Sequence, residues 1–203
     1  FKIYAEVFIM ESKTKTNLLR AFAGECQARM RYEIAAKIAG KNDLAIIQDM
    51  LYFTANQVKE HAIIFYNYLK DVFKDEDVSM HANYPVDLGQ DLASLLEDAS
   101  KHEYDEATTI YKQFGNEAKE EGYIDIATSF FMISEIEQYH HERFKKYHSL
   151  LTSNKLFKES NNVKWMCLNC GFIYEGNEAI NVCPVCKHSN GYSLRLNETQ
   201  FHV

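Results

Sequence analysis

The first 150 residues divide into two halves that repeat one pattern of acids and histidines. Glu25 precedes His61 by 36 residues, and Glu103 precedes His140 by 37. Each half therefore offers a carboxylate on one helical segment and an imidazole on the next. In the second half, Glu137 lies three residues before His140, and this spacing puts both on one face of a helix. We expect these groups to meet inside a helical bundle, where such side chains bind metal ions.

Hydrophobic residues recur at helical spacing along most of this region. The predicted helices cover residues 16–39, 43–72, 88–121 and 124–151. The sequence Gly40-Lys41-Asn42-Asp43 predicts a stop, a turn and a new N-cap, and Gly122 ends the third helix. The polar stretch 74–85 is long for a bundle connection and suits a crossover along the bundle's length. The sequence thus predicts a mainly α fold, with a ferritin-like four-helix bundle over residues 10–152.

A different kind of domain is predicted after the bundle. The Ser/Asn/Lys-rich stretch 153–162 is typical of a linker, and residues 163–203 then form a small domain. About forty residues hold too small a core to fold unaided, so a bound metal would supply the missing stability. The ligands would be the two Cys-x-x-Cys pairs, Cys167, Cys170, Cys183 and Cys186.

The metal at the four cysteines is iron or zinc by spacing alone, since both accept tetrahedral thiolate sites. The flanking sequences Cys-x-x-Cys-Gly-Phe-Ile-Tyr and Cys-Pro-Val-Cys resemble the two knuckles of a rubredoxin. This resemblance favours iron. The fifth cysteine, Cys26, stands alone, and we expect it to be a small packed residue.

The bundle residues suit a dinuclear metal centre, since carboxylates and imidazoles are ligands that iron accepts. Acidic helices also carry such pairs on solvated faces, but here candidate ligands occur on all four predicted helices. Tyr32 and Tyr111 lie one or two turns away, where hydroxyls can orient ligating carboxylates or simply pack in the core. The proposed ligands are Glu25, His61, Glu103, Glu106, Glu137 and His140.

Charge and hydropathy exclude several classes of function. The net charge of −7 argues against nucleic acid as a partner. No apolar run is long enough to span a membrane, so no membrane partner is expected. Residues 1–9 lack the layout of a signal peptide, and Met10 is a candidate start that would make them an extension. With the thiolate usage, these features predict a cytoplasmic protein.

Several motifs together resemble those of the rubrerythrin family, and the resemblance covers nearly the whole chain after Thr14. It implies a bundle with a non-haem di-iron centre and a C-terminal rubredoxin-like domain with one iron. It also implies a peroxidase that reduces hydrogen peroxide to water, with electrons from a reduced rubredoxin or an NAD(P)H-linked reductase. Family members are usually head-to-tail homodimers. The matching segments are Ala21–Arg29, Thr54–His61, Glu103-x-x-Glu106, Glu120–Tyr123 and Glu137-x-x-His140.

The resemblance also implies roles for the ligands. One iron would be held by Glu25, Glu106 and His61, and the last two would alternate as ligands when the redox state changes. The other iron would be held by Glu103 and His140. Tyr32 and Tyr111 match tyrosines that support the ligands in the family.

Val58 is where the chain departs from the family. The resemblance implies two bridging carboxylates, of which Glu137 is one, and Val58 stands at the position of the other. The internal repeat marks the same gap, because Val58 precedes His61 as Glu137 precedes His140. The centre could therefore bind two metals more weakly, with water or hydroxide filling the gap, or be mononuclear or impaired.

Two other classes of function fit parts of the sequence. A ferritin-like protein that binds or oxidises iron would use the bundle but would not need the four cysteines. A regulatory or structural protein would hold zinc at the cysteines beside a decayed bundle site.

Overall fold

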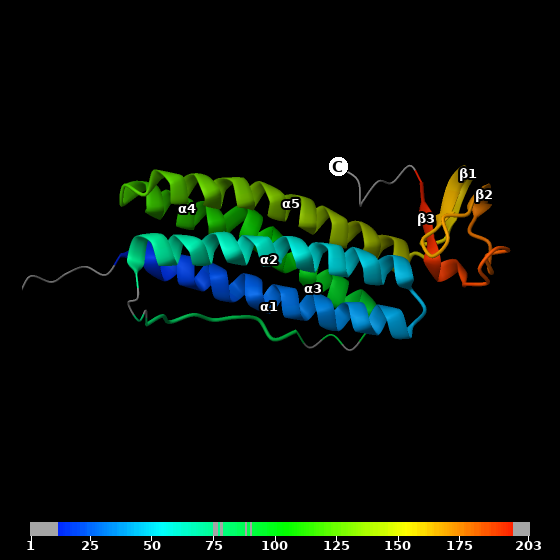
Figure 1. Ribbon diagram of the computed structural model, residues 1–203, viewed down its shortest axis with the longest axis horizontal. Coiled ribbons are helices and arrows are strands. Elements are labelled where there is room, and N and C mark those ends of the chain that lie inside the picture. Colours follow the sequence, from blue (N-terminus) through cyan, green and yellow to red (C-terminus); the bar gives the residue numbers. More distant parts are fainter. Residues whose placement is uncertain (1–11, 75–76, 78, 88, 90, 197–203) are drawn as a thin grey trace, which may run out of the picture.

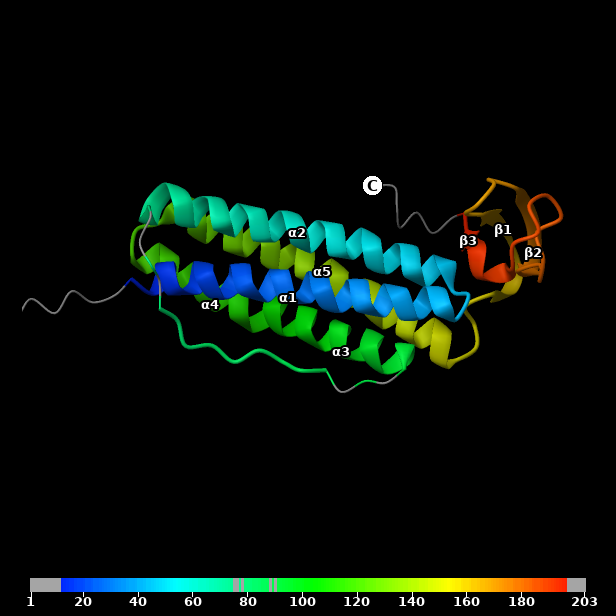
Figure 2. The same ribbon diagram turned by 60° about the horizontal axis from the view of Figure 1, so that its bottom comes forward.

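The computed structural model describes residues 12–74, 77, 79–87, 89 and 91–196, so the predictions made for residues 1–9 and Met10 fall outside it. Long helices form an elongated bundle, and a small sheet lies at one end (Figure 1). A segment without regular structure runs along the outside of the bundle between the second and third helices (Figure 2). The predicted fold class, a ferritin-like bundle followed by a rubredoxin-like domain, is confirmed. The helical elements are α1 (Lys13–Lys41), α2 (Ala45–Phe73), α3 (Leu92–Asp105), the π-helical turn η1 (Glu106–Ile110), α4 (Tyr111–Glu120) and α5 (Ile124–Thr152).

The start of α1 is held by the end of α4. The Ser12 side chain caps the helix by accepting from the amide of Lys15. The Glu121 carboxylate accepts from the amides of Lys13 and Thr14 at 2.8 and 3.1 Å. These amides are free donors at a helix N-terminus, where the helix dipole also favours a negative charge. The contact therefore fixes the register of the first helix against the second half of the bundle.

The predicted N-cap at Asp43 is wrong. Asp43 has a φ of 58°, and the residue that caps α2 is Leu44, which makes no side-chain bond. The amides of Asp43 and Leu44 instead bond to the carbonyls of Gly40 and Ala39 at 3.1 and 3.0 Å. Asp43 is one of the few residue types that adopt this left-handed conformation readily, so it closes α1 rather than opening α2.

The third predicted helix is interrupted in its middle. The amide of Tyr111 bonds to the carbonyl of Glu106, five residues back, which defines the π-helical turn η1. The hydroxyl of Thr108 donates to the carbonyl of Tyr104 at 2.7 Å, a contact that bends helices. The turn begins at Glu106, three residues after Glu103, which still lies on α3.

Two apolar clusters fill the bundle, one toward each end. The cluster nearer the sheet includes Ala28, Met50 and Val58, and the other includes Phe65 and Phe130. The residues proposed as metal ligands lie between them along the sequence of each helix. Packing on both sides therefore fixes the rotation of the helices that carry the ligands.

The small domain is built on three antiparallel strands in the order β2-β1-β3. Strand β1 begins at Lys158, inside the segment 153–162 that was predicted as a linker, and the domain boundaries themselves stay a prediction. The Trp165 ring is fully buried, with the Arg195 guanidinium 4.8 Å from its centroid. The elements are β1 (Lys158–Cys167), β2 (Ile173–Glu178), the 3₁₀ turn η2 (Asn190–Tyr192) and β3 (Ser193–Arg195).

The small domain packs against the end of the bundle. Leu156 and Leu194 are buried within the apolar cluster of the bundle's end. A Cβ atom added at Gly191 would lie 1.7 Å from the carbonyl oxygen of Asp43, in the turn between α1 and α2. Because that atom belongs to the backbone, only a glycine allows this approach.

Replacing Gly191 by alanine should therefore separate the two domains. We expect Gly191→Ala to lower the free energy of unfolding by about 1–3 kcal/mol, the usual cost of overpacking. The measurement is chemical denaturation. Gly176→Ala is the matched control, because its new Cβ would lie 3.5 Å from the nearest atom, at ordinary contact distance. Equal stabilities of the two variants would contradict this account of the docking.

Candidate metal centres

The first group of candidate ligands joins three helices. Glu25 of α1, His61 of α2 and Glu137 of α5 each offer one ligand atom, all within 4.8 Å of one another. The Nδ1 atom of His61 lies 2.8 Å from Oε1 of Glu137 and 3.6 Å from Oε1 of Glu25. These atoms converge closely enough to hold one ion.

A second group shares one member with the first. Glu103 of α3 and His140 of α5 each bring a ligand atom within 4.8 Å of Glu137. Nδ1 of His140 lies 2.6 Å from Oε2 of Glu137 and 3.4 Å from Oε2 of Glu103. Glu137 thus turns one oxygen toward each histidine. This arrangement would allow one carboxylate to contact two ions.

The burial of these side chains fits a pair of bound metal ions. Glu25, Glu103, Glu137 and His140 are at most 1% exposed, and His61 is 5% exposed. Buried charged groups without partners are costly, and native proteins nearly always satisfy them. Metal ions would satisfy the buried atoms that lack a hydrogen-bond partner, which are Oε2 of Glu25, Nδ1 of His61, Oε2 of Glu103, both oxygens of Glu137 and Nδ1 of His140.

The protonation of these groups follows from their packing. Burial opposes the charged form of Glu137, but His140 and His61 outweigh it and hold its pKa well below the usual range. Burial likewise opposes charge on His61, yet Glu137 and Glu25 raise its pKa to about 11. Burial, and then the charge of Glu137, raise the pKa of Glu103 to about 8. Glu137 is therefore an anion that needs cations on two sides, and metal ions binding there would displace the imidazole protons.

Two tyrosines support the outer carboxylates. The Tyr111 hydroxyl donates to Oε1 of Glu25 at 2.6 Å, and the Tyr32 hydroxyl donates to Oε1 of Glu103. Both tyrosines are at most 2% exposed. Each bond occupies one carboxylate oxygen and leaves the other free, so the tyrosines orient the acids toward the centre.

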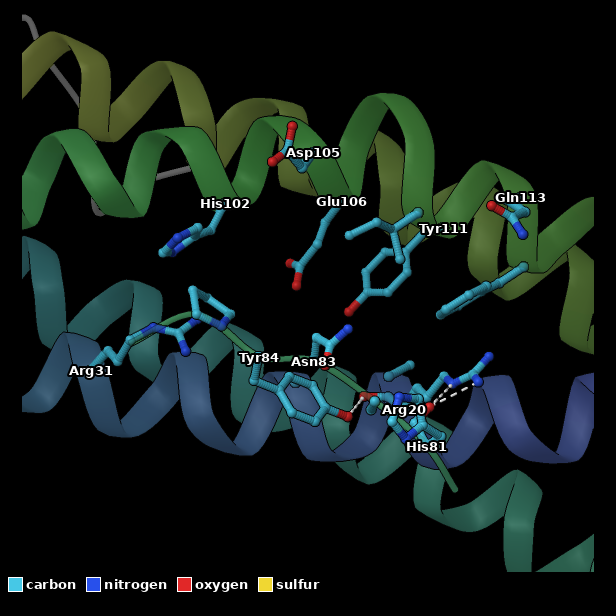
Figure 3. A pocket seen from close by; sticks show the side chains of 16 residues that line it. Arg20, Arg31, His81, Asn83, Tyr84, His102, Asp105, Glu106, Tyr111 and Gln113 are labelled. Carbon is cyan, nitrogen blue, oxygen red and sulfur yellow. Dashed lines mark hydrogen bonds between the residues drawn. The ribbon is translucent and has the colours of Figure 1, made fainter. Parts of the chain in front are cut away.

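Glu106 and Val58 stand apart from the two groups. Glu106 does not join either of them, although its pKa is raised well above the usual range by burial and by Glu25 and Glu103. Its carboxylate is half-buried and points into a cavity beside the centre (Figure 3). Val58 is 1% exposed and packs in the apolar cluster.

Two residues near His140 were missed by the sequence analysis. The Oε1 atom of Gln57 lies 3.1 Å from Nε2 of His140 and accepts from Arg143 Nη1 at 2.9 Å. Arg143 also donates to the hydroxyl of Thr54. This bond on Nε2 leaves Nδ1 of His140 to face the carboxylates. Arg143 lies three residues after His140, and that spacing could have indicated a shared face.

The four cysteines converge in the small domain. The Sγ atoms of Cys167 and Cys186 are 3.6 Å apart, and those of Cys170 and Cys183 are 3.7 Å apart. A tetrahedral site with metal–sulfur bonds of about 2.3 Å has edges of about 3.8 Å, so the spacing fits one ion. The amide of His188 leads the interactions that lower the pKa of the Cys186 thiol to about 5, which favours the thiolate.

The remaining cysteine differs from its prediction. Cys26 is exposed, not packed. It follows Glu25 on α1, and one residue turns a helix by about 100°. Because Glu25 faces the interior, Cys26 faces outward.

Among the described residues, no helix combines the length and apolarity that crossing a membrane requires.

Comparisons with known proteins agree with this geometry. The family model described as rubrerythrin matches residues 16–148, and that of the rubrerythrin rubredoxin-like domain matches residues 165–192. A rubrerythrin of Clostridium perfringens is 42% identical over 188 residues, which cover 93% of this chain and 96% of that protein. A rubrerythrin of Nitratidesulfovibrio vulgaris is 34% identical and covers 89% of this chain and 93% of its own length.

Solved structures agree on the fold. A structure of partially reduced nigerythrin superposes with a TM-score of 0.61 at 21% identity, covering 96% of this chain and 92% of that one. A Desulfovibrio desulfuricans bacterioferritin superposes with a TM-score of 0.62 at 22% identity, covering 70% of this chain and 82% of its own. The predicted cofactors, a di-iron centre in the bundle and a metal at the four cysteines, are those of the matched family. With two family models and close relatives along nearly its whole length, this chain belongs to the rubrerythrin family.

Proposed function

We propose that this protein is a peroxidase that reduces hydrogen peroxide to water at the bundle centre. The observation that carries the proposal is Glu137, which turns one oxygen toward each of the two ligand groups. A carboxylate in this position can hold two metal ions side by side. Iron ions there would supply the two electrons that the peroxide bond accepts.

The reaction consumes one hydrogen peroxide, two electrons and two protons, and yields two water molecules. The protein has to fix the ligands, keep the centre shielded and deliver electrons. Tyr32 and Tyr111 orient the outer acids, and Gln57 orients His140. His61 faces Glu25 and Glu137, whereas Glu106 faces the cavity. These positions support His61, rather than Glu106, as the metal ligand in the conformation that the structure has.

The electrons would arrive through the iron at the four cysteines, a centre suited to one-electron transfer. Within one chain this route is long. The small domain touches Asp43, and Asp43 lies about 27 Å along the helix axis from Glu25. Electron transfer slows steeply with distance. We therefore infer a head-to-tail homodimer, in which the four-cysteine site of one subunit serves the bundle of the other.

The electron donor and the compartment complete the proposal. A reduced rubredoxin or an NAD(P)H-linked reductase would reduce the four-cysteine site. The thiolate site favours a reducing compartment, so we place the protein in the cytoplasm.

Val58 favours one competing function, a bundle site that is impaired or mononuclear. Its buried side chain offers no oxygen where the family has a second bridge. A charge count argues that two ferrous ions still bind. Three acids, Glu25, Glu103 and Glu137, lie at the centre, and Glu106 beside it could supply a fourth charge to match the four positive charges of the ions. A ferritin-like protein that binds or oxidises iron would not need the four-cysteine site, which argues against that alternative.

The peroxidase proposal predicts how the reduced protein responds to oxidants. Protein reduced without oxygen should be oxidised faster by hydrogen peroxide than by the same concentration of dioxygen, as followed by stopped-flow absorbance. With excess reductant the wild type should turn over repeatedly. Cys183→Ser should react once and then stop, because it lacks the electron path. Faster oxidation by dioxygen would instead favour iron oxidation or storage.

Restoring the missing carboxylate should strengthen metal binding. We expect Val58→Glu to bind the bundle metals more tightly by at least about tenfold, since even the partners of ligands change affinity by this much. The measurement is metal content after graded chelation. Val58→Gln is the control, because it adds a similar volume without a charge. If Val58→Glu and Val58→Gln retained the same metal content, Val58 would be without consequence.

The dimer proposal can be tested by complementation. Cys183→Ser lacks the electron path, and Glu137→Gln lacks the bridging carboxylate, so each should be inactive alone. If electrons cross between subunits, co-expression should restore roughly a quarter of the wild-type turnover, because half the dimers are mixed and each has one working pair. The peroxidase assay measures this recovery. No recovery in purified mixed dimers would indicate transfer within one chain.

A further inference from the structure

A cavity of about 680 Å³ lies between α1, the crossover and the segment from the end of α3 through η1 to α4. Figure 3 shows it with side chains from all three. Its floor includes Glu106 and Tyr111, and its roof is the crossover segment 81–85. Tyr111 also donates to the proposed ligand Glu25, so this residue lies between the cavity and the bundle centre.

The cavity is far larger than hydrogen peroxide requires. A water molecule occupies about 30 Å³ in the liquid, whereas sites for small organic ligands usually measure about 300–1,000 Å³. The wall combines polar and apolar groups. Glu106 is the acid nearest the bundle centre, and Arg20, Arg31 and Gln113 are also polar. Ile110, Phe114, Pro85 and the ring of Tyr84 provide apolar surface.

The roof is fixed to the bundle along its length. The Arg20 guanidinium donates to the carbonyl of His81 at 2.9 and 3.1 Å, and the Tyr84 hydroxyl donates to the carbonyl of Arg20 at 2.9 Å. Further along, the Asp87 carboxylate lies 3.4 Å from Nε of Arg31 and 3.5 Å from Nε2 of His102. These contacts hold the cavity open as a preformed pocket.

Gly24 is the position where this pocket is most easily filled. A Cβ added there would lie 3.7 Å from the Tyr84 ring and 3.9 Å from the Glu106 carboxylate. It would therefore point between the roof and the acid, at ordinary contact distance. An alanine fits without displacing either neighbour, and a larger side chain would extend into the cavity.

We propose that this cavity binds organic hydroperoxides and that the protein reduces them as a second class of substrate. The hydroperoxide group would lie at Glu106, next to the bundle centre, and the apolar substituent against Ile110, Phe114 and Tyr84. The reaction takes one hydroperoxide, two electrons and two protons. The oxygen–oxygen bond breaks, and an alcohol and a water molecule form. The inference rests on the proposed peroxidase function, which supplies the electrons.

The kinetic test compares cumene hydroperoxide with hydrogen peroxide on the reduced, metal-loaded protein. We expect Gly24→Leu to lower the ratio of the two rate constants by roughly tenfold or more, because a blocked apolar pocket loses at least that much discrimination. Gly24→Ala is the matched control and should keep the ratio near the wild-type value. Metal content is measured for all three proteins. An unchanged ratio in Gly24→Leu, or no reaction of the wild type with cumene hydroperoxide, would overturn the inference.

A binding test does not depend on turnover. The alcohol formed from cumene hydroperoxide, 2-phenyl-2-propanol, is titrated into the metal-loaded protein by calorimetry. Wild type and Gly24→Ala should bind one molecule per bundle, and Gly24→Leu should bind roughly tenfold more weakly or not at all. Equal binding by all three would show that the ligand lies elsewhere. If the alcohol binds as expected but neither peroxide oxidises the protein, the pocket stands and the peroxidase function fails.

Discussion

The contact of Glu137 with two imidazoles is the constraint on which the bundle depends. This carboxylate is fully buried, and it lies 2.8 Å from His61 and 2.6 Å from His140. An uncompensated charge there would be strongly destabilising. Glu137 lies on α5, His61 on α2, and the acids Glu25 and Glu103 on α1 and α3. These side chains meet only if all four helical segments keep the same alignment along the bundle axis. The apolar clusters on both sides supply that alignment, so packing and charge require the same arrangement.

Val58 bears on both folding and the proposed metal binding. It lies three residues before His61 on α2 and is buried in the apolar cluster. A carboxylate there would be one more acid to bury while the metals are unbound. An apolar residue removes that cost and adds packing, but it also removes a ligand. On our proposal, valine at this position would therefore stabilise the metal-free bundle and weaken its hold on the ions.

The sequence was informative where chemistry depends on spacing. The two cysteine pairs and the Glu137–His140 pair were found from their separation alone, because helix and knuckle geometry convert separation into proximity. The π-helical turn was not, since no glycine or proline marks it and its sequence Glu-Ala-Thr-Thr-Ile differs little from that of a helix. Asp43 was misread because it suits both an N-cap and a left-handed turn. Gln57 was missed because its role depends on packing between α2 and α5.

Glu103 and Glu106, on either side of the junction between α3 and η1, lie differently with respect to the bundle centre. Glu103 and Glu106 are three residues apart, so a regular helix would present both to the interior. The structure nevertheless distinguishes them: Glu103 is 1% exposed, while Glu106, the first residue of η1, is half-buried and faces the cavity. The opposite pair, Glu137 and His140, lies on the uninterrupted α5 and is closed to solvent. The centre is thus closed on the side of α5 and borders the cavity on the side of η1, which is where our proposal places the substrate.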